Sequence, residues 1–159
     1  LGEVIHVADQ RITINCATIG NPHCVVFCDA PNEALARQLG PLLEQHELFP
    51  NHSNVQFVKV LDLHTLQMEI WERGAGYTFA SGSSSCAAAA VARKLNLVEA
   101  EVCVKMRGGE INIDVAHDYR VTMTGPVRKI AEGEIENLGD TSTLLDPTVV
   151  EQIKNSRIG

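Results

Sequence analysis

A charged pair, a glycine-rich turn and a run of small residues follow one another between residues 71 and 92. Glu72 and Arg73 end a strand-like segment. The segment 81–85 contains four serines and one glycine, and 86–92 contains only cysteine, alanine and valine. Side chains of opposite charge beside a serine-rich helix start are suited to holding a small ionic ligand, so this stretch is the first candidate for a site.

The helix expected from Ser85 to Ala92 has no polar stripe, and such helices are normally buried on every side. The first N–H groups of a buried helix need acceptors from outside the helix. An anion fits, because the N–H donors and the positive end of the helix dipole point the same way. The alternative is a helix capped by serine hydroxyls and packed in a core. The pair Glu72-Arg73, expected to be buried beside this helix start, favours a carboxylate site.

Alternating and β-branched segments predict about eight strands. The candidate segments, nine in all, are residues 4–7, 12–19, 24–28, 54–60, 66–71, 101–106, 110–115, 119–124 and 127–136. Pro31 marks the start of an amphipathic crossover helix, with an interruption at Gly40-Pro41. Arg107-Gly108 is typical of a hairpin turn, and Asn96 can close the second helix.

Together these elements predict an α+β domain, in which a strongly curved mixed β-sheet wraps around a buried central helix. We expect this domain to cover residues 1–136. Residues 137–159 are expected to form a polar tail with a short helix at 148–154.

The composition argues against several classes of protein. With 13 basic and 20 acidic residues, the net charge of −7 gives no nucleic-acid footprint. No apolar run reaches the roughly 20 residues that a membrane span needs. The chain opens Leu1-Gly2-Glu3 without a basic region, so no signal peptide is expected. It also opens without methionine, which predicts that Leu1 is not the natural start and that the chain is a fragment, a processed form or a trimmed form.

Five cysteines are an odd number, and none has companion histidines at zinc-finger spacing. The sequence therefore predicts no metal site. Buried free thiols in a reducing cytoplasm are the simplest interpretation.

Five motifs, in order and with matching spacing, resemble the C-terminal half of the diaminopimelate epimerase family. They are Gly20-Asn21-Pro22-His23-Cys24, Asn54-Val55-Gln56-Phe57, Trp71-Glu72-Arg73-Gly74-Ala75-Gly76, Gly108-Gly109 and Met123-Thr124-Gly125-Pro126. The resemblance covers roughly residues 1–136. One such motif alone is weak, but five in register are specific.

The resemblance implies a cofactor-independent isomerase that interconverts LL- and meso-diaminopimelate, a precursor of lysine and peptidoglycan. Two domains of this fold face each other across a cleft, and a cysteine from each lies on opposite faces of the substrate α-carbon. One thiolate removes the α-proton and the other thiol returns one. The N-terminal half with the first cysteine is absent from this chain and is the expected partner. A homodimer is left open.

Four residues are implied to bind the distal amino-acid end of the substrate. Asn21 and Asn54 match residues that contact this end, and Glu72 and Arg73 match a pair that recognises it. The alternative for Asn21 is simple turn chemistry beside Pro22.

The resemblance also assigns the reacting end. Gly82 and Ser83 match backbone donors to the substrate carboxylate, while His23 and Glu72 match residues that tune the reacting thiol. Ser81 stands where the family has its second catalytic cysteine. A serine hydroxyl is a far weaker acid than a thiol and needs activation.

Three explanations of Ser81 are open: an engineered change, a natural relative with altered chemistry, or lost activity. Cys86 is no substitute, since it lies a turn or more inside the helix. Tyr77 stands where an acidic residue is frequent, which favours natural divergence and a changed substrate. The alternatives to epimerisation are one-base chemistry in a related isomerase and a domain that binds an amino acid without turning it over. The chain is expected to fold alone and to catalyse nothing without the other half.

Overall fold

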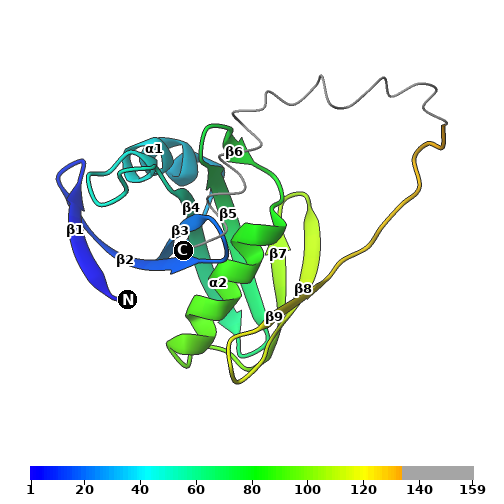
Figure 1. Ribbon diagram of the computed structural model, residues 1–159. Coiled ribbons are helices and arrows are strands. Elements are labelled where there is room, and N and C mark those ends of the chain that lie inside the picture. Colours follow the sequence, from blue (N-terminus) through cyan, green and yellow to red (C-terminus); the bar gives the residue numbers. More distant parts are fainter. Residues whose placement is uncertain (134–159) are drawn as a thin grey trace, which may run out of the picture. The chain divides into compact units, whose positions relative to one another are not determined.

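The computed structural model describes residues 1–133 of the chain (Figure 1). Residues Leu1–Pro126 form one compact unit, and Val127 begins a second. The expected boundary at residue 136 and the expected helix at 148–154 lie outside the described residues.

The first unit contains two helices and a nine-stranded mixed sheet. The elements are β1 (Glu3–Val7), β2 (Gln10–Thr18), β3 (Pro22–Phe27), α1 (Glu33–Glu44), β4 (Asn54–Asp62), β5 (Thr65–Glu72), β6 (Gly76–Thr78), α2 (Gly82–Lys94), β7 (Glu101–Met106), β8 (Gly109–Val115) and β9 (Val121–Thr124). The strand order is β1-β2-β3-β4-β5-β7-β8-β9, with β6 paired to β5. The predicted α+β class with a mixed sheet is confirmed.

The two helices are the crossovers of the two parallel strand pairs, β3–β4 and β5–β7. Such crossovers are right-handed in nearly all proteins. Because β4 and β5 are antiparallel, the second crossover starts from a strand that runs the opposite way. Two right-handed crossovers then place their helices on opposite faces of the sheet.

Side-chain burial agrees with this arrangement. Val25 and Val58 belong to the apolar cluster that contains the alanines of α2, whereas Val26 and Phe57 belong to the cluster of α1. Alternate residues of β3 and β4 therefore contact different helices. Figure 1 shows α2 lying across the strands of the sheet, and it contacts β2, β3, β4, β5, β7, β8 and β9.

Helix α2 is longer than predicted. It begins at Gly82, with Ser81 as N-cap, and reaches Lys94. The serines extend the first turn because their hydroxyls find partners within it. Asn96 adopts a φ of 57° just after the last turn and closes the helix as predicted.

The predicted interruption of α1 at Gly40-Pro41 is wrong, because the helix continues to Glu44. It begins after Pro31, with Asn32 accepting the amide of Leu35 at 2.9 Å. Gly40 has a packing role: a Cβ there would lie 2.5 Å from Cγ of Trp71. The glycine therefore allows close approach of α1 to β5.

Two further predictions need correction. The strand predicted at 127–136 is absent from 127–133, where no neighbouring strand is paired, and 134–136 lie outside the described residues. Period-two alternation predicts a strand only where a partner supplies hydrogen bonds. Strand β6 was not predicted, since three residues in a glycine-rich turn carry no pattern. Its pairing with β5 holds the turn after Glu72 against the sheet.

The five cysteines are free, as predicted, but only Cys24 is fully buried and Cys16 is exposed. Within residues 1–133, neither helix combines the length and apolarity needed to cross a bilayer.

Candidate substrate-binding site

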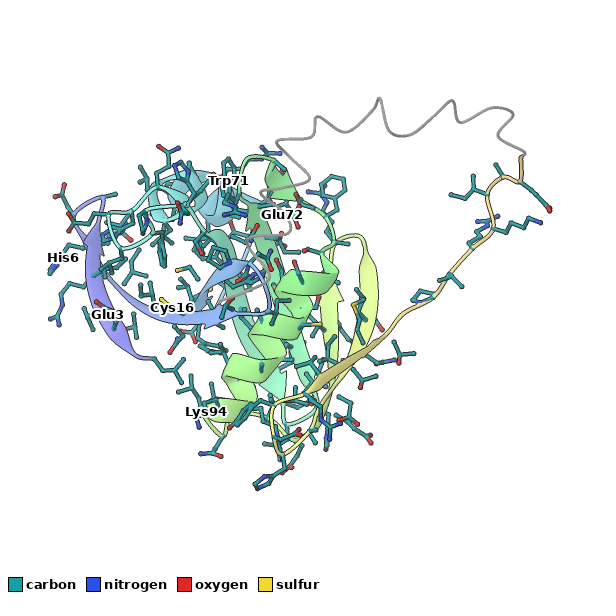
Figure 2. The ribbon with its side chains drawn as sticks, in the orientation of Figure 1. Glu3, His6, Cys16, Trp71, Glu72 and Lys94 are labelled. Atoms are coloured by element: carbon teal, nitrogen blue, oxygen red, sulfur yellow. The ribbon has the colours of Figure 1, made fainter. Side chains whose placement is uncertain are left out.

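Three adjacent strands bring predicted site residues to one face of the sheet. His23 on β3 pairs in parallel register with Asn54 on β4, and the neighbouring Val55 pairs with Trp71 on β5. Because side chains alternate, His23, Asn54 and Glu72 share the face that carries α2, while Trp71 faces α1. Figure 2 shows Trp71 and Glu72 side by side at the end of β5.

His23 is the centre of a buried polar chain. Its Nε2 lies 3.1 Å from Oδ1 of Asn21, and its Nδ1 lies 3.1 Å from Nε2 of Gln56. The same amide nitrogen donates to Oγ of Ser84, in the first turn of α2, at 3.0 Å. An unbroken set of hydrogen bonds thus connects the turn before β3 to the start of α2.

These hydrogen bonds fix which nitrogen of the imidazole carries the proton. An amide NH₂ only donates, so Nδ1 of His23 accepts and Nε2 carries the proton, which it donates to Asn21. Burial lowers the pKa of His23 from 6.5 to about 4, and Glu72 opposes the shift. His23 is therefore a neutral imidazole near pH 7.

The state of His23 gives a testable dependence of stability on pH. The unfolded chain takes up a proton on this ring below pH 6.5, whereas the folded chain resists until about pH 4. The free energy of unfolding is therefore expected to fall as pH falls through this window. Urea denaturation at several pH values measures the slope. His23→Gln should reduce it, and His117→Gln on the exposed β8–β9 turn should not; equal slopes in all three chains would contradict the assignment.

Asn54 ties two turns together. Its Nδ2 donates to the carbonyl of Pro22 at 3.0 Å, and its Oδ1 accepts the amide of Arg73 at 3.1 Å. Each of these atoms retains capacity for one more hydrogen bond, so substrate contact by Asn54 stays a prediction. Its position between the two turns keeps Asn21 and Glu72 in fixed relation.

Glu72 and Arg73 were expected to be buried as a pair, but Glu72 is half-buried and Arg73 is exposed. The guanidinium of Arg73 donates from Nη1 to the carbonyl of Asn51 at 2.9 Å. The strand ends at Glu72, and the chain turns outward there, which brings Arg73 to the rim of the site.

The start of α2 is half-buried, and its donors are only partly used. Oγ of Ser81 lies 3.4 Å from both the amide of Ser84 and Oγ of Ser83. In the described part of the chain, the N–H groups of Gly82 and Ser83 have no hydrogen-bond acceptor. Ser81 is itself within one turn of Ser84, and so is linked indirectly to His23.

Tyr77 does not reach this site through its hydroxyl, which donates to Glu69 at 2.6 Å. Its ring lies under the guanidinium of Arg37 at 4.8 Å and against Phe79 at 5.8 Å between centroids. This packing holds the segment that leads to Ser81, so the tyrosine has a local structural role.

Two residues of the site were missed in the sequence. Gln56 was quoted within a motif but given no role, although a glutamine on the same strand face as Asn54, inside an apolar strand, signals a buried polar contact. Glu44 binds Trp71 and Gly74 and was hidden by the predicted interruption of α1. Among residues 1–133, no group of three or more His, Cys, Asp or Glu side chains is arranged to hold a metal ion.

Two solved structures share this architecture with TM-scores above 0.5. A hydroxyproline epimerase from Agrobacterium vitis superposes with a TM-score of 0.58 at 13% identity, over 72% of this chain and 40% of that one. A methylitaconate-δ-isomerase gives a TM-score of 0.54 at 14% identity, over 76% and 44%. The chain therefore shares the fold of these two proteins.

The sequence comparison identifies the family of the chain. The family model of diaminopimelate epimerase matches residues 15–130, so the chain belongs to the diaminopimelate epimerase family. Diaminopimelate epimerase 2 of Nostoc sp. is 54% identical over 133 residues, which are 84% of this chain and 47% of that protein. Diaminopimelate epimerase of Moorella thermoacetica is 38% identical over 84% of this chain and 48% of its own. The chain spans about half the length of these curated relatives.

Proposed function

We propose that this chain is the C-terminal half of a cofactor-independent amino-acid epimerase and holds one side of a stereoinverting site. The observation that carries the proposal is the free donor pair at Gly82 and Ser83, beside a sheet face that presents His23 and Glu72. Membership of the diaminopimelate epimerase family supports diaminopimelate as substrate. The free cysteines favour the cytoplasm as location.

The helix start suits the substrate carboxylate. Two unused N–H groups and the positive end of the α2 dipole would stabilise the charge that grows there as the α-proton leaves. Breaking the Cα–H bond moves its electron pair toward the carboxylate, and a new proton must arrive at the other face of Cα. Ser81 lies beside this helix start, and the missing half would supply the opposed group.

The neutral state of His23 suits a residue next to the reacting group. An uncharged imidazole adds no positive charge that would compete with the substrate for the helix start. Glu72 lies on the next strand but one and shares this face, so the two residues can set the local potential around Ser81.

Calorimetric titration of the chain tests the proposal. Diaminopimelate should bind more tightly than lysine, histidine or glutamate, since only it offers a second ammonium and carboxylate to Asn21, Asn54 and Arg73. Equal affinities would favour a general amino-acid carboxylate site. If none of the four amino acids binds, the result contradicts the proposal.

A second experiment tests whether one half can catalyse. In deuterated water the chain alone should exchange no α-proton of diaminopimelate, because a serine hydroxyl is a weak base without activation and the other half's thiol is absent from the assay. Exchange by the isolated chain would instead support one-base chemistry in a related isomerase. Ser81 favours that second candidate, since a hydroxyl stands where the family has a thiol.

A further inference from the structure

Glu44, the last residue of α1, has a buried carboxylate where a negative charge is not expected. The C-terminal end of a helix carries a partial negative charge, which disfavours an acidic side chain. Yet Glu44 is only 7% exposed. A carboxylate kept at such a position needs strong hydrogen-bond donors.

The donors come from the end of β5 and the turn after it, where the sheet packs against α1. The indole N–H of Trp71 donates to Oε2 of Glu44 at 2.7 Å, and the amide of Gly74 donates to Oε1 at 3.0 Å. Nδ1 of His52 lies 3.5 Å from the same Oε1 and is the one titratable group of the described residues in contact with the carboxylate. Thus one side chain of α1 binds residues on both sides of Glu72 and Arg73.

Trp71 and Gly74 lie on either side of Glu72 and Arg73, the first two residues of a tight turn. The amide of Ala75 donates to the carbonyl of Glu72 at 3.1 Å, and Gly74 has a φ of 73°, as a turn residue with a left-handed conformation requires. Trp71 fixes the end of β5, and Gly74 fixes the turn that follows. The backbone of the two residues between them has little freedom left.

We infer that Glu44 is a positioning residue: its carboxylate sets the turn Glu72–Ala75 and thereby orients Glu72 and Arg73 toward the substrate. The binding part of this inference rests on the proposed function, whereas the turn geometry does not. Sequence position alone would not reveal the role, since Glu44 is 28 residues from Glu72 in the chain (72 − 44 = 28).

The ionisation of Glu44 agrees with this role. Burial alone would raise its pKa, but hydrogen bonds from the Trp71 indole, the Gly74 amide and the His52 ring outweigh burial and lower the pKa below 4.5. The stabilising carboxylate is thus present at pH 7 and is lost only as pH falls below its ordinary range.

Trp71 is the single tryptophan of the chain and reports directly on this contact. The experiment compares the 159-residue chain with Glu44→Gln and with Glu47→Gln, a matched loss of one carboxylate at an exposed position nearby. Three quantities are measured: Trp71 emission from pH 7 to pH 3, amide chemical shifts of residues 72–75, and calorimetric affinity for meso-diaminopimelate.

In Glu44→Gln, the emission change below pH 4.5 should disappear and the amides of 72–75 should shift. Trp71 and Gly74 donate to different oxygens of the carboxylate, and glutamine replaces one of these oxygens by an NH₂ donor, so one of the two N–H groups loses its acceptor. Affinity should fall about tenfold, the scale of one lost hydrogen bond to a charged group. Glu47→Gln should match the unchanged chain in all three.

Unmoved amides and emission in Glu44→Gln would overturn the inference. The inference would also be overturned if the unchanged chain binds diaminopimelate and Glu44→Gln shifts the amide signals of residues 72–75 without changing the affinity. Glu44 would then have a purely structural role. If the unchanged chain does not bind diaminopimelate, the proposed function fails, and the amide shifts and emission alone decide whether Glu44 sets the turn.

Discussion

Ser81→Cys is expected to raise α-proton exchange from diaminopimelate by about 10²-fold or more, the usual contribution of a well-placed acid–base group. The measurement requires the missing half, which the unmatched part of the Nostoc relative can supply in a chimeric chain. Position 81 is the N-cap of α2. A thiol there gains from the helix dipole, which lowers the pKa of cysteine at helix starts, whereas a hydroxyl stays far from ionisation.

The control places a thiol elsewhere on the same unit. Thr122→Cys on β9 adds an exposed thiol on the sheet face opposite to Met123, the residue that lies against Gly82, and should leave the exchange rate unchanged. An equal rate for Ser81 and Ser81→Cys would contradict two-base epimerisation. It would favour a related isomerase in which the serine is the natural residue and one base does the work.

Gly40→Ala is expected to lower the free energy of unfolding by about 2 kcal/mol. Alanine would gain about 0.5–1 kcal/mol of helix propensity, but the added Cβ meets Cγ and Cβ of Trp71 at 2.5 and 2.6 Å. Cβ of Trp71 is tied to the backbone of β5 and cannot rotate away, so α1 must move, and overpacking of this kind costs about 1–3 kcal/mol.

Urea denaturation followed by far-UV circular dichroism measures the loss, because this signal does not depend on Trp71. Gly125→Ala is the matched addition of one methyl group, because its Cβ would meet only Cγ1 of Ile111 at an ordinary 3.8 Å. Combining Gly40→Ala with Trp71→Ala should cost less than the sum of the two single losses, because alanine removes Cγ and Cδ2 of Trp71 from the contact. A Gly40→Ala chain as stable as the unchanged one would show that α1 can shift freely against β5.

Most strands could be predicted because alternation and turn residues are local signals. The strand predicted at 101–106 has these same bounds in the structure, and the strands predicted at 54–60, 66–71 and 110–115 needed only shifted ends. Gly40-Pro41 misled the prediction because both residues usually end helices, and the reason for Gly40 lies in Trp71, 31 residues away (71 − 40 = 31). The strand predicted at 127–136 is wrong for residues 127–133, because no described strand pairs with them.

The sequence motifs predicted the candidate site residues that belong to them. They did not reveal the side chains that hold these motifs in place. Family membership is confirmed, while the roles of Asn21, His23 and Ser81 stay predictions. Gln56 and Glu44 were missed since their partners are reached only through the folded sheet. Gln56 hydrogen-bonds the motif residue His23, and Glu44 accepts hydrogen bonds from the motif residues Trp71 and Gly74.

The antiparallel pairing of β4 and β5 also affects the local stability of the candidate site. It places the two crossover helices on opposite faces of the sheet, each with its own apolar cluster, and packed clusters of this kind can open as separate units of local unfolding. Trp71 belongs to one cluster, and its neighbour Glu72 extends the strand face of the other. Opening of either cluster would displace one of these adjacent residues, so the site lasts only as long as the less stable cluster stays closed.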